Sequence, residues 1–357
     1  MSDEKQDAND WARDGGPFRA DDAETVEPMP PPSWRTIGEL LTPAFDRFAR
    51  RAAGEEKPVP LPWTPVGQAL GGPKHPGLPN GLHVLVGNTK SGKSQFAIQA
   101  ALHAAQHGTP VLYIALELGE DDLVARVAGV LTRKKWSRLW LGEDADEIEK
   151  VRTKAEEDLR ALPLAFEVAP PYEWTYSTLR DRAALFRRHY ADVLDGADGK
   201  PHRPFLLVLD FLQIVQGDGR EDLRERIQKA SYYARDVARR MHAAVLLISS
   251  TARENYARLE GRETDARGKP PKDAPKLGEG DPGRLIGLGK ESGEIEFSAD
   301  SVLVLAREPW PLDPAKKAPK RPESSTVWLA VAGARAVLPS WVELRFNGGW
   351  FTDAESA

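Results

Sequence analysis

The chain has 357 residues, of which 41% are hydrophobic, so it is long enough to bury a core in one large domain or two ordinary ones. It has no cysteine, and its seven histidines show no ligand spacing, which excludes a disulfide framework and a thiolate metal site. With no signal-peptide pattern and no apolar run near about 18 residues, we expect a soluble, cytoplasmic protein with no membrane partner.

The net charge of −5 is unevenly distributed. Residues 1–30 contain nine acids and three bases, a net charge of −6, so the remaining residues sum to +1. Because the body is nearly neutral, any binding to nucleic acid must depend on local basic patches.

Residues 1–33 are acidic, poor in hydrophobic residues and rich in proline at their end, which predicts a disordered tail. Residues 34–56 carry an apolar stripe at helical spacing, which predicts an amphipathic helix, or two short ones if Pro43 interrupts it. The stripe consists of Ile37, Leu40, Leu41, Phe45 and Phe48. Such a helix packs either on its own core or on a partner.

From residue 57 to 352, short apolar runs alternate with segments of helical periodicity. The predicted strands are 82–87, 110–117, 164–168, 205–210, 243–250, 301–306, 326–332 and 341–346. The predicted helices are 94–108, 121–134, 147–162, 177–194 and 224–242. Continuous apolar runs are typical of strands buried on both faces, and their alternation with helices predicts a mainly parallel α/β sheet. Residues 353–357 form a tail.

The segment GNTKSGKSQ follows a predicted strand and precedes a predicted helix. Its pattern, Gly87-x4-Gly92-Lys93-Ser94, is that of a phosphate-binding loop. Glycines let the backbone N–H groups wrap around phosphate oxygens, Lys93 reaches the outer phosphates, and Ser94 holds Mg²⁺. We therefore expect a site for ATP and Mg²⁺. Its nucleotide-binding residues are Gly87, Asn88, Thr89, Lys90, Ser91, Gly92, Lys93, Ser94 and Gln95.

Two carboxylates end other predicted strands. Asp210 closes FLLVLD, and we expect this strand to lie beside the phosphate loop and its acid to hold Mg²⁺. Glu117 closes VLYIALE and has the position of a base that deprotonates the attacking water. The alternatives are an aspartate that caps a turn and a glutamate that faces solvent.

Four segments resemble, in order, blocks of the C-terminal, RecA-like ATPase domain of the DnaB family of replicative DNA helicases. The segments are LYIALELGEDDLVAR, LLVLDFLQIVQG, ESGEIEFSADSVLVLAR and GARAVLPSWVELRFNGGWF. The similarity extends over about residues 58–352 and predicts a RecA-like fold with a C-terminal antiparallel hairpin. The resemblance implies that Glu117 is the catalytic glutamate, that Gln213 belongs to the nucleotide site, and that Arg335 is an arginine finger reaching a neighbour's ATP. It also implies that the 34–56 helix docks on an adjacent subunit of a homo-oligomeric ring.

The chain departs from the family pattern at several places. The family's helical N-terminal domain has no counterpart before residue 34, Ser250 stands where the family has Gln, and Gly333 replaces the lysine that accompanies the finger. Arg253 keeps the arginine of the same block. These changes leave ATP hydrolysis as the expectation, and they favour an alternative to a helicase, a KaiC-like regulatory ATPase that acts on a protein partner.

Contacts to single-stranded DNA are expected from two loops, because the family uses pore-facing loops for them. Residues 253–290 contain nine bases against seven acids, and 308–322 include the basic run KKAPKR. Tyr256 is a candidate to stack on a base. A loop of mixed charge that is merely solvated is the alternative.

Overall fold

The computed structural model describes residues 35–170, 172, 174–199, 201–217, 219–252, 255–260, 276–288, 298–307, 312–313, 318–319, 322–335 and 337–354. The chain divides into two compact units, Met1–Ala49 and Arg50–Ala357. The predicted tail at 1–33 and large parts of the two predicted DNA-binding loops lie outside the described residues, among them Arg253 and the four bases of the run KKAPKR.

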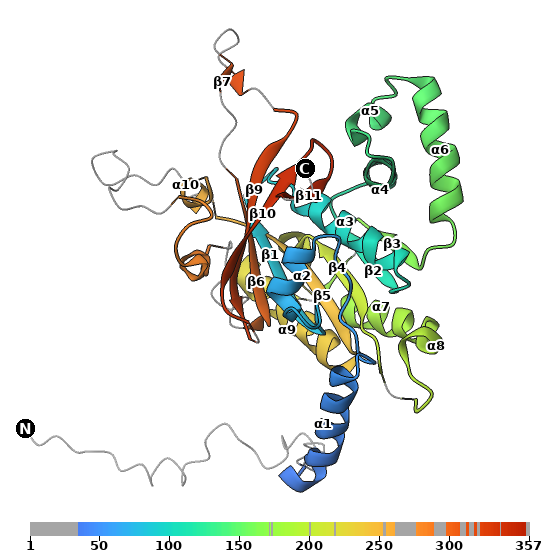
Figure 1. The fold of residues 1–357 in the computed structure, drawn as a ribbon, viewed down its shortest axis with the longest axis vertical. Coiled ribbons are helices and arrows are strands. Elements are labelled where there is room, and N and C mark those ends of the chain that lie inside the picture. Colours follow the sequence, from blue (N-terminus) through green and yellow to red (C-terminus); the bar gives the residue numbers. More distant parts are fainter. Residues whose placement is uncertain are drawn as a thin grey trace, which may run out of the picture. The chain divides into compact units, whose positions relative to one another are not determined.

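The larger unit is built on a nine-stranded sheet with the order β11-β10-β9-β6-β1-β5-β4-β2-β3 (Figure 1). Its strands are β1 Gly81–Gly87, β2 Val111–Ala115, β3 Leu164–Val168, β4 Phe205–Asp210, β5 Ala243–Ser250, β6 Ser301–Ala306, β9 Ser325–Ala334, β10 Ser340–Phe346 and β11 Phe351–Asp353. The first six pair in parallel, and the last three run antiparallel. The short strands β7 (Leu312–Asp313) and β8 (Ala318–Pro319) pair separately. The predicted α/β class and the C-terminal antiparallel strands are confirmed.

Helices cover both faces of this sheet (Figure 1). They are α2 Thr64–Gly71, α3 Lys93–Gln106, α4 Glu120–Thr132, α5 Trp136–Trp140, α6 Ala145–Leu159, α7 Tyr176–His189, α8 Ala191–Leu194, α9 Leu223–Arg240 and α10 Tyr256–Leu259, with one-turn 3-10 helices η3 Leu212–Ile214 and η5 Pro282–Leu285. Successive strand side chains point to opposite faces. Val84 and Val86 therefore join the cluster under α7 and α9, whereas Leu85 joins the one under α2, α3 and α4.

Two predicted helices differ in detail from those observed. The pattern at 177–194 is divided at Tyr190, which leaves the helical conformation between α7 and α8. The pattern at 121–134 ends at Thr132, because Arg133 adopts a left-handed conformation that stops α4. Within the described residues, each helix is too short or too polar to traverse a lipid bilayer.

The last strand is locked to the helix that follows the phosphate loop. The Gln99 side chain of α3 donates to the Phe351 carbonyl at 2.7 Å and accepts from the Phe351 N–H at 2.7 Å. The Phe351 ring packs edge-on against Trp63 and Phe96. β11 is thus part of the core on the face covered by α3.

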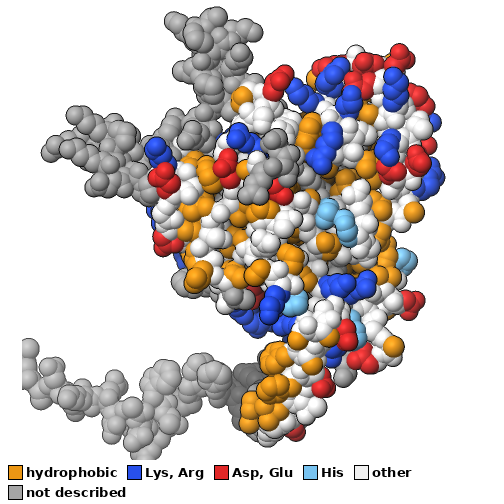
Figure 2. All heavy atoms as spheres, viewed as in Figure 1, with side chains coloured by type: hydrophobic (Ala, Val, Ile, Leu, Met, Phe, Trp, Pro, Cys, Tyr) orange, Lys and Arg blue, Asp and Glu red, His pale blue; other side chains and the backbone are white. Residues whose placement is uncertain are grey.

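The helix α1 (Ile37–Ala52) runs unbroken through Pro43. Pro43 is the seventh residue of the helix, so it removes the N–H that would bond the Glu39 carbonyl, and the Arg35 side chain donates to that carbonyl at 3.4 Å instead. No residue of α1 is buried, and its apolar stripe is exposed, from 41% at Leu40 to 75% at Ile37. Hydrophobic side chains accordingly gather along this helix in Figure 2.

Candidate nucleotide site

The phosphate loop has the strand–turn–helix context that its sequence predicts. β1 ends at Gly87, the Ser91 N–H donates to the Asn88 carbonyl, and α3 begins at Lys93. Gly92 has φ +105°, and a Cβ at this position would lie 3.0 Å from the Phe351 ring. Only glycine fits here, because the backbone is left-handed and the aromatic ring leaves no space.

Lys93 turns back over its own loop. Its ammonium donates to the Gly87 and Asn88 carbonyls at 2.8 and 2.9 Å. Burial lowers the pKa of Lys93 to about 8, while the charges of Asp210 and Glu117 act in the opposite direction. The ammonium therefore lies within the electrostatic reach of both predicted acids.

Asp210 is almost completely buried at the end of β4. Its Oδ2 accepts a 2.7 Å hydrogen bond from the Tyr113 hydroxyl, and its Oδ1 is buried with no hydrogen-bond partner among the described residues. Burial raises the pKa of Asp210, and the hydroxyls of Tyr113 and Ser94 and the charge of Lys93 oppose that rise. A carboxylate oxygen without a partner, next to the Ser94 hydroxyl, suits a hard divalent cation such as Mg²⁺.

Glu117 lies two residues beyond β2 and is exposed. Partial burial of its carboxyl group and the charge of Asp210 raise the pKa of Glu117, while Lys93 and Arg126 oppose that rise. β2 and β4 are neighbours with Ala115 opposite Asp210, so the two acids end adjoining strands as predicted.

The position of β4 relative to the loop was predicted wrongly. β5 lies between β1 and β4, so the Asp210 strand is not the direct neighbour of the phosphate-loop strand. The order of the strands depends on where each helical crossover connection places the next strand. The residues of a single strand carry no information about that placement. Asp210 still reaches Lys93, because all parallel strands end at the same edge.

A cavity of about 500 Å³ joins these groups. The predicted residues that line it are Thr89, Lys90, Gly92, Lys93, Ser94, Gln95, Glu117 and Asp210. Gly87 contributes its carbonyl to Lys93, and the Asn88 and Ser91 side chains are buried beneath the loop. The structure thus brings the loop, both acids and Ser94 together.

Two predicted residues lie elsewhere. The Gln213 side chain donates to the Ser249 hydroxyl at 2.8 Å and accepts from the Ser250 N–H at 3.2 Å, so it is fixed against the end of β5. Arg335 follows β9 at the opposite edge of the sheet, where it pairs with Asp300 at 3.0 Å. Arg335 cannot act on its own chain's phosphate loop.

Other residues at the site were not predicted. The Arg126 guanidinium lies 4.0 Å from the centre of the Trp136 ring and donates to Gln95 at 3.3 Å. Arg307 and Phe346 line the cavity. Tyr113 had a signal in the sequence, because a tyrosine inside a buried strand needs a hydrogen-bond partner. The others come from loops and strands far apart in the chain and carry no local signal.

Tyr256 on α10 contacts the phosphate loop. Its hydroxyl lies 2.9 Å from the Thr89 hydroxyl and accepts from the Thr89 N–H at 3.3 Å. A second, longer contact joins the Asn88 amide to Glu260 at 3.4 Å. α10 therefore touches the loop at two points through polar groups, and base stacking by the Tyr256 ring stays a prediction.

Comparison with known proteins agrees with this geometry. The family model of the DnaB-like helicase C terminal domain matches residues 74–351. A solved structure of a DnaB-like replicative helicase, studied with its interactions with primase, has 16% identity and a TM-score of 0.63 over 89% of this chain and 67% of that chain. A second solved structure, that of an ATPase domain, has 17% identity and a TM-score of 0.64 over 89% of this chain and 98% of that chain. No curated protein sequence is significantly similar. The predicted RecA-like fold is confirmed.

Proposed function

The chain belongs to the family of DnaB-like helicases, whose C-terminal domain it carries, and on that premise we propose that it hydrolyses ATP to move along single-stranded DNA as a ring of identical subunits. One observation carries the proposal. The Lys93 ammonium, the Ser94 hydroxyl and the Asp210 and Glu117 carboxylates surround a single cavity at the phosphate loop. This is the set of groups that phosphoryl transfer requires.

Binding follows from the loop geometry. The backbone N–H groups at the start of α3 and the positive end of its dipole attract the phosphates of ATP. Lys93 exchanges the Gly87 and Asn88 carbonyls for phosphate oxygens. Arg307 and Phe346, at the cavity wall, offer a cation and an aromatic ring to the rest of the nucleotide.

Ser94 and Asp210 would hold Mg²⁺, since Asp210 Oδ1 is buried beside Ser94 without a hydrogen-bond partner in the described part of the chain. When bound, Mg²⁺ neutralises charge that develops on the phosphate oxygens. Tyr113 orients the Asp210 carboxylate by donating to its other oxygen.

Glu117 acts as the general base. The water oxygen forms a bond to the γ-phosphorus, its proton passes to the Glu117 carboxylate, and the bridging oxygen leaves with its electron pair on ADP. A raised pKa brings this carboxylate closer to the affinity for a proton that a base needs.

The ring is supported by two features that one chain cannot use alone. Arg335 lies at the sheet edge opposite its own phosphate loop, so it can serve only the ATP of another copy. The exposed apolar stripe of α1 offers a surface that a neighbouring subunit can bury. In a ring every subunit both supplies and receives such contacts.

The assay compares ATP hydrolysis with and without single-stranded DNA, at low salt because phosphate contacts weaken as salt rises. We expect DNA to stimulate turnover. If DNA neither stimulates turnover nor binds to the protein at low salt, the DNA part of the proposal is refuted. The control is Lys93→Ala, which should abolish turnover in both conditions.

A regulatory ATPase acting on a protein partner is the second candidate. It is favoured by Gly333, which replaces the finger's companion lysine: a Cβ there would lie 3.1 Å from the Ile286 side chain, so the position is covered. Strand displacement on a forked duplex separates the two functions. Displacement that requires ATP supports the helicase, whereas ATPase activity that is indifferent to DNA supports the regulator.

A further inference from the structure

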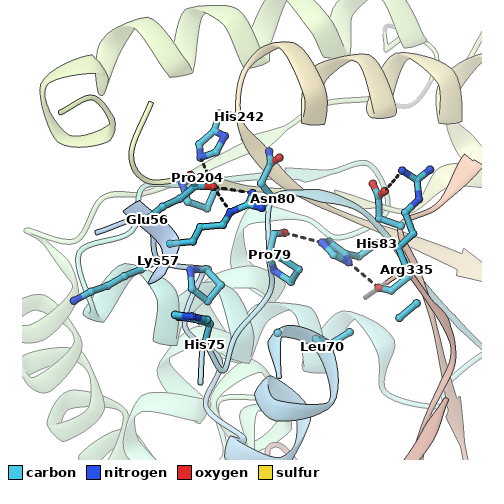
Figure 3. Close-up of a pocket in the computed structure, with 16 residues that line it drawn as sticks. Glu56, Lys57, Leu70, His75, Pro79, Asn80, His83, Pro204, His242 and Arg335 are labelled. Carbon is cyan, nitrogen blue, oxygen red and sulfur yellow. Dashed lines mark hydrogen bonds and ion pairs between the residues drawn. The ribbon is translucent and has the colours of Figure 1, made fainter. Parts of the chain in front are cut away.

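A second cavity, of about 340 Å³, lies at the edge of the sheet opposite the nucleotide site (Figure 3). It is lined by residues at the starts of β1 and β6 and by the end of β9, including His83, Asp300 and Arg335. In Figure 3 the Arg335 side chain extends along the cavity wall and pairs with a carboxylate there, that of Asp300. This ion pair is not used by the chemistry described above.

Asp300 ties Arg335 to the start of the phosphate-loop strand. One carboxylate oxygen pairs with Arg335 Nη1 at 3.0 Å, and the other accepts from the Leu82 N–H at 2.8 Å. The Asp300 backbone repeats the arrangement, since its N–H donates to the Leu82 carbonyl and its carbonyl accepts from the Arg335 N–H. A Cβ on residue 81 would lie 2.8 Å from the Asp300 carboxylate, so a glycine at this position is what leaves room for the acid.

The backbone before Arg335 also influences the direction of this side chain. The register between β6 and β9 shifts at Val302/Leu303, a bulge that re-aims the end of β9. The Ile286 side chain covers Gly333 next to the bulge. The direction in which Arg335 leaves the sheet is therefore fixed by the bulge, by Ile286 and by Asp300.

We propose that Asp300 is the positioning residue of the Arg335 finger and links it to β1 of the same chain. The inference rests on the proposed function, in which Arg335 serves a neighbour's ATP. A guanidinium has five N–H donors in a rigid fork. Asp300 engages Nη1, which leaves donors that can reach phosphate oxygens. Because β1 carries the phosphate loop at its other end, Asp300 connects the finger to the strand that bears its own chain's nucleotide site.

The Asp300–Arg335 pair contributes little to stability, because Arg335 is 54% exposed and solvent screens such an ion pair. Asp300→Asn keeps one oxygen that can accept from the Leu82 N–H. The other carboxylate oxygen, which pairs with Arg335, is replaced by an uncharged NH2 group. We expect kcat for ATP to fall about 10- to 100-fold, as for a misplaced catalytic group. KM and the melting temperature should stay near those of the wild type. Glu343→Gln, which removes a carboxylate paired with Arg345 on β10, is the matched control and should leave kcat unchanged.

Mixed rings then test the positioning role. An Asp300→Asn chain keeps Glu117, and a Glu117→Gln chain keeps its finger, so random mixing in equal amounts gives roughly a quarter of interfaces a complete site and a well-placed finger. We expect the mixture to recover about that share of wild-type turnover, although each variant alone keeps about a tenth of it or less. The same recovery is expected for Arg335→Ala mixed with Glu117→Gln.

Each outcome has a distinct meaning. If the Arg335→Ala mixture stays inactive, the finger in trans fails, and with it that part of the proposed function. If it recovers but the Asp300→Asn mixture does not, Asp300 acts on its own site and only the positioning role is overturned. Should Asp300→Asn not fold, Asp300→Glu, which keeps the carboxylate one methylene further out, takes its place in the same mixture. An Asp300→Glu chain with wild-type kcat, or one that is not rescued by Glu117→Gln, overturns the positioning role as well.

Discussion

Replacing Tyr113 by Phe tests the electrostatics of the site without touching a group that contacts substrate. The Tyr113 hydroxyl is fully buried and donates to Asp210 Oδ2 at 2.7 Å, while Asp210 Oδ1 has no hydrogen-bond partner among the described residues. The substitution therefore leaves a buried carboxylate with neither oxygen well satisfied. A hydrogen bond to a charged group is worth about 1.5–3 kcal/mol, so we expect a loss of about 2 kcal/mol in the free energy of unfolding at neutral pH.

The loss should depend on pH in a defined direction. Burial raises the pKa of Asp210 above its ordinary 3.8, so the folded chain binds a proton before the unfolded chain does, and this group favours folding as the pH falls through that window. Tyr113→Phe removes a donor to the ionised form and raises this pKa further. The difference between wild type and variant is therefore largest near neutral pH and shrinks in acid.

Urea unfolding of the nucleotide-free chain measures both effects. The control is Tyr232→Phe, the same change at a half-exposed tyrosine of α9, which should cost less than about 0.5 kcal/mol. In an Asp210→Asn background the cost of Tyr113→Phe should fall to about 1 kcal/mol, the value for a neutral hydrogen bond. A Tyr113→Phe loss no larger than that of the control, or one that grows in acid, would refute the reasoning.

Three further predictions concern the nucleotide site. Glu117→Gln should lower kcat about 10²- to 10⁴-fold while nucleotide binding persists, and unchanged turnover would remove Glu117 from the chemistry. Because burial lowers the pKa of Lys93 to about 8, binding ATP at pH 8 should take up a fraction of a proton, and the affinity for ATP should fall at higher pH. Calorimetry in two buffers of different ionisation enthalpy measures this proton uptake. A binding enthalpy that is the same in both buffers would contradict the prediction. Tyr256→Phe removes the contact with Thr89 and should weaken binding of a fluorescent nucleotide about five-fold, the equivalent of about 1 kcal/mol, whereas equal affinity would show that the contact does not support the loop.

Eight strands of the main sheet were predictable because each is a short, mostly apolar run. All residues of the run 205–210 are buried, as are those of 243–250 except Ser250, and both runs form central strands. The order of the strands was not predictable, since the place of β5 between β1 and β4 depends on how crossovers pack. Likewise the short β11 has no pattern of its own and is held by Gln99 and aromatic rings from elsewhere.

The nucleotide site likewise has a part that was predictable from the sequence and a part that was not. The phosphate loop is contiguous in sequence, and Asp210 and Glu117 end strands that run to one edge, so their convergence was predictable from the strand pattern. The contacts of Tyr256 and Asp300 were not, because each joins segments more than 160 residues apart. Such contacts depend on the completed fold, and the local residue pattern contains no trace of them.

The two hydrogen bonds between Gln99 and Phe351 can form only late in the synthesis of the chain. The two residues are 252 positions apart, and at a synthesis rate of about 5–20 residues per second Phe351 follows Gln99 by roughly 13–50 s. During that interval the apolar face of α3 has no final covering, and the ring that fills the space beside Gly92 does not yet exist. A nascent chain arrested before Phe351 should therefore not retain ATP, although its whole phosphate loop has already been made.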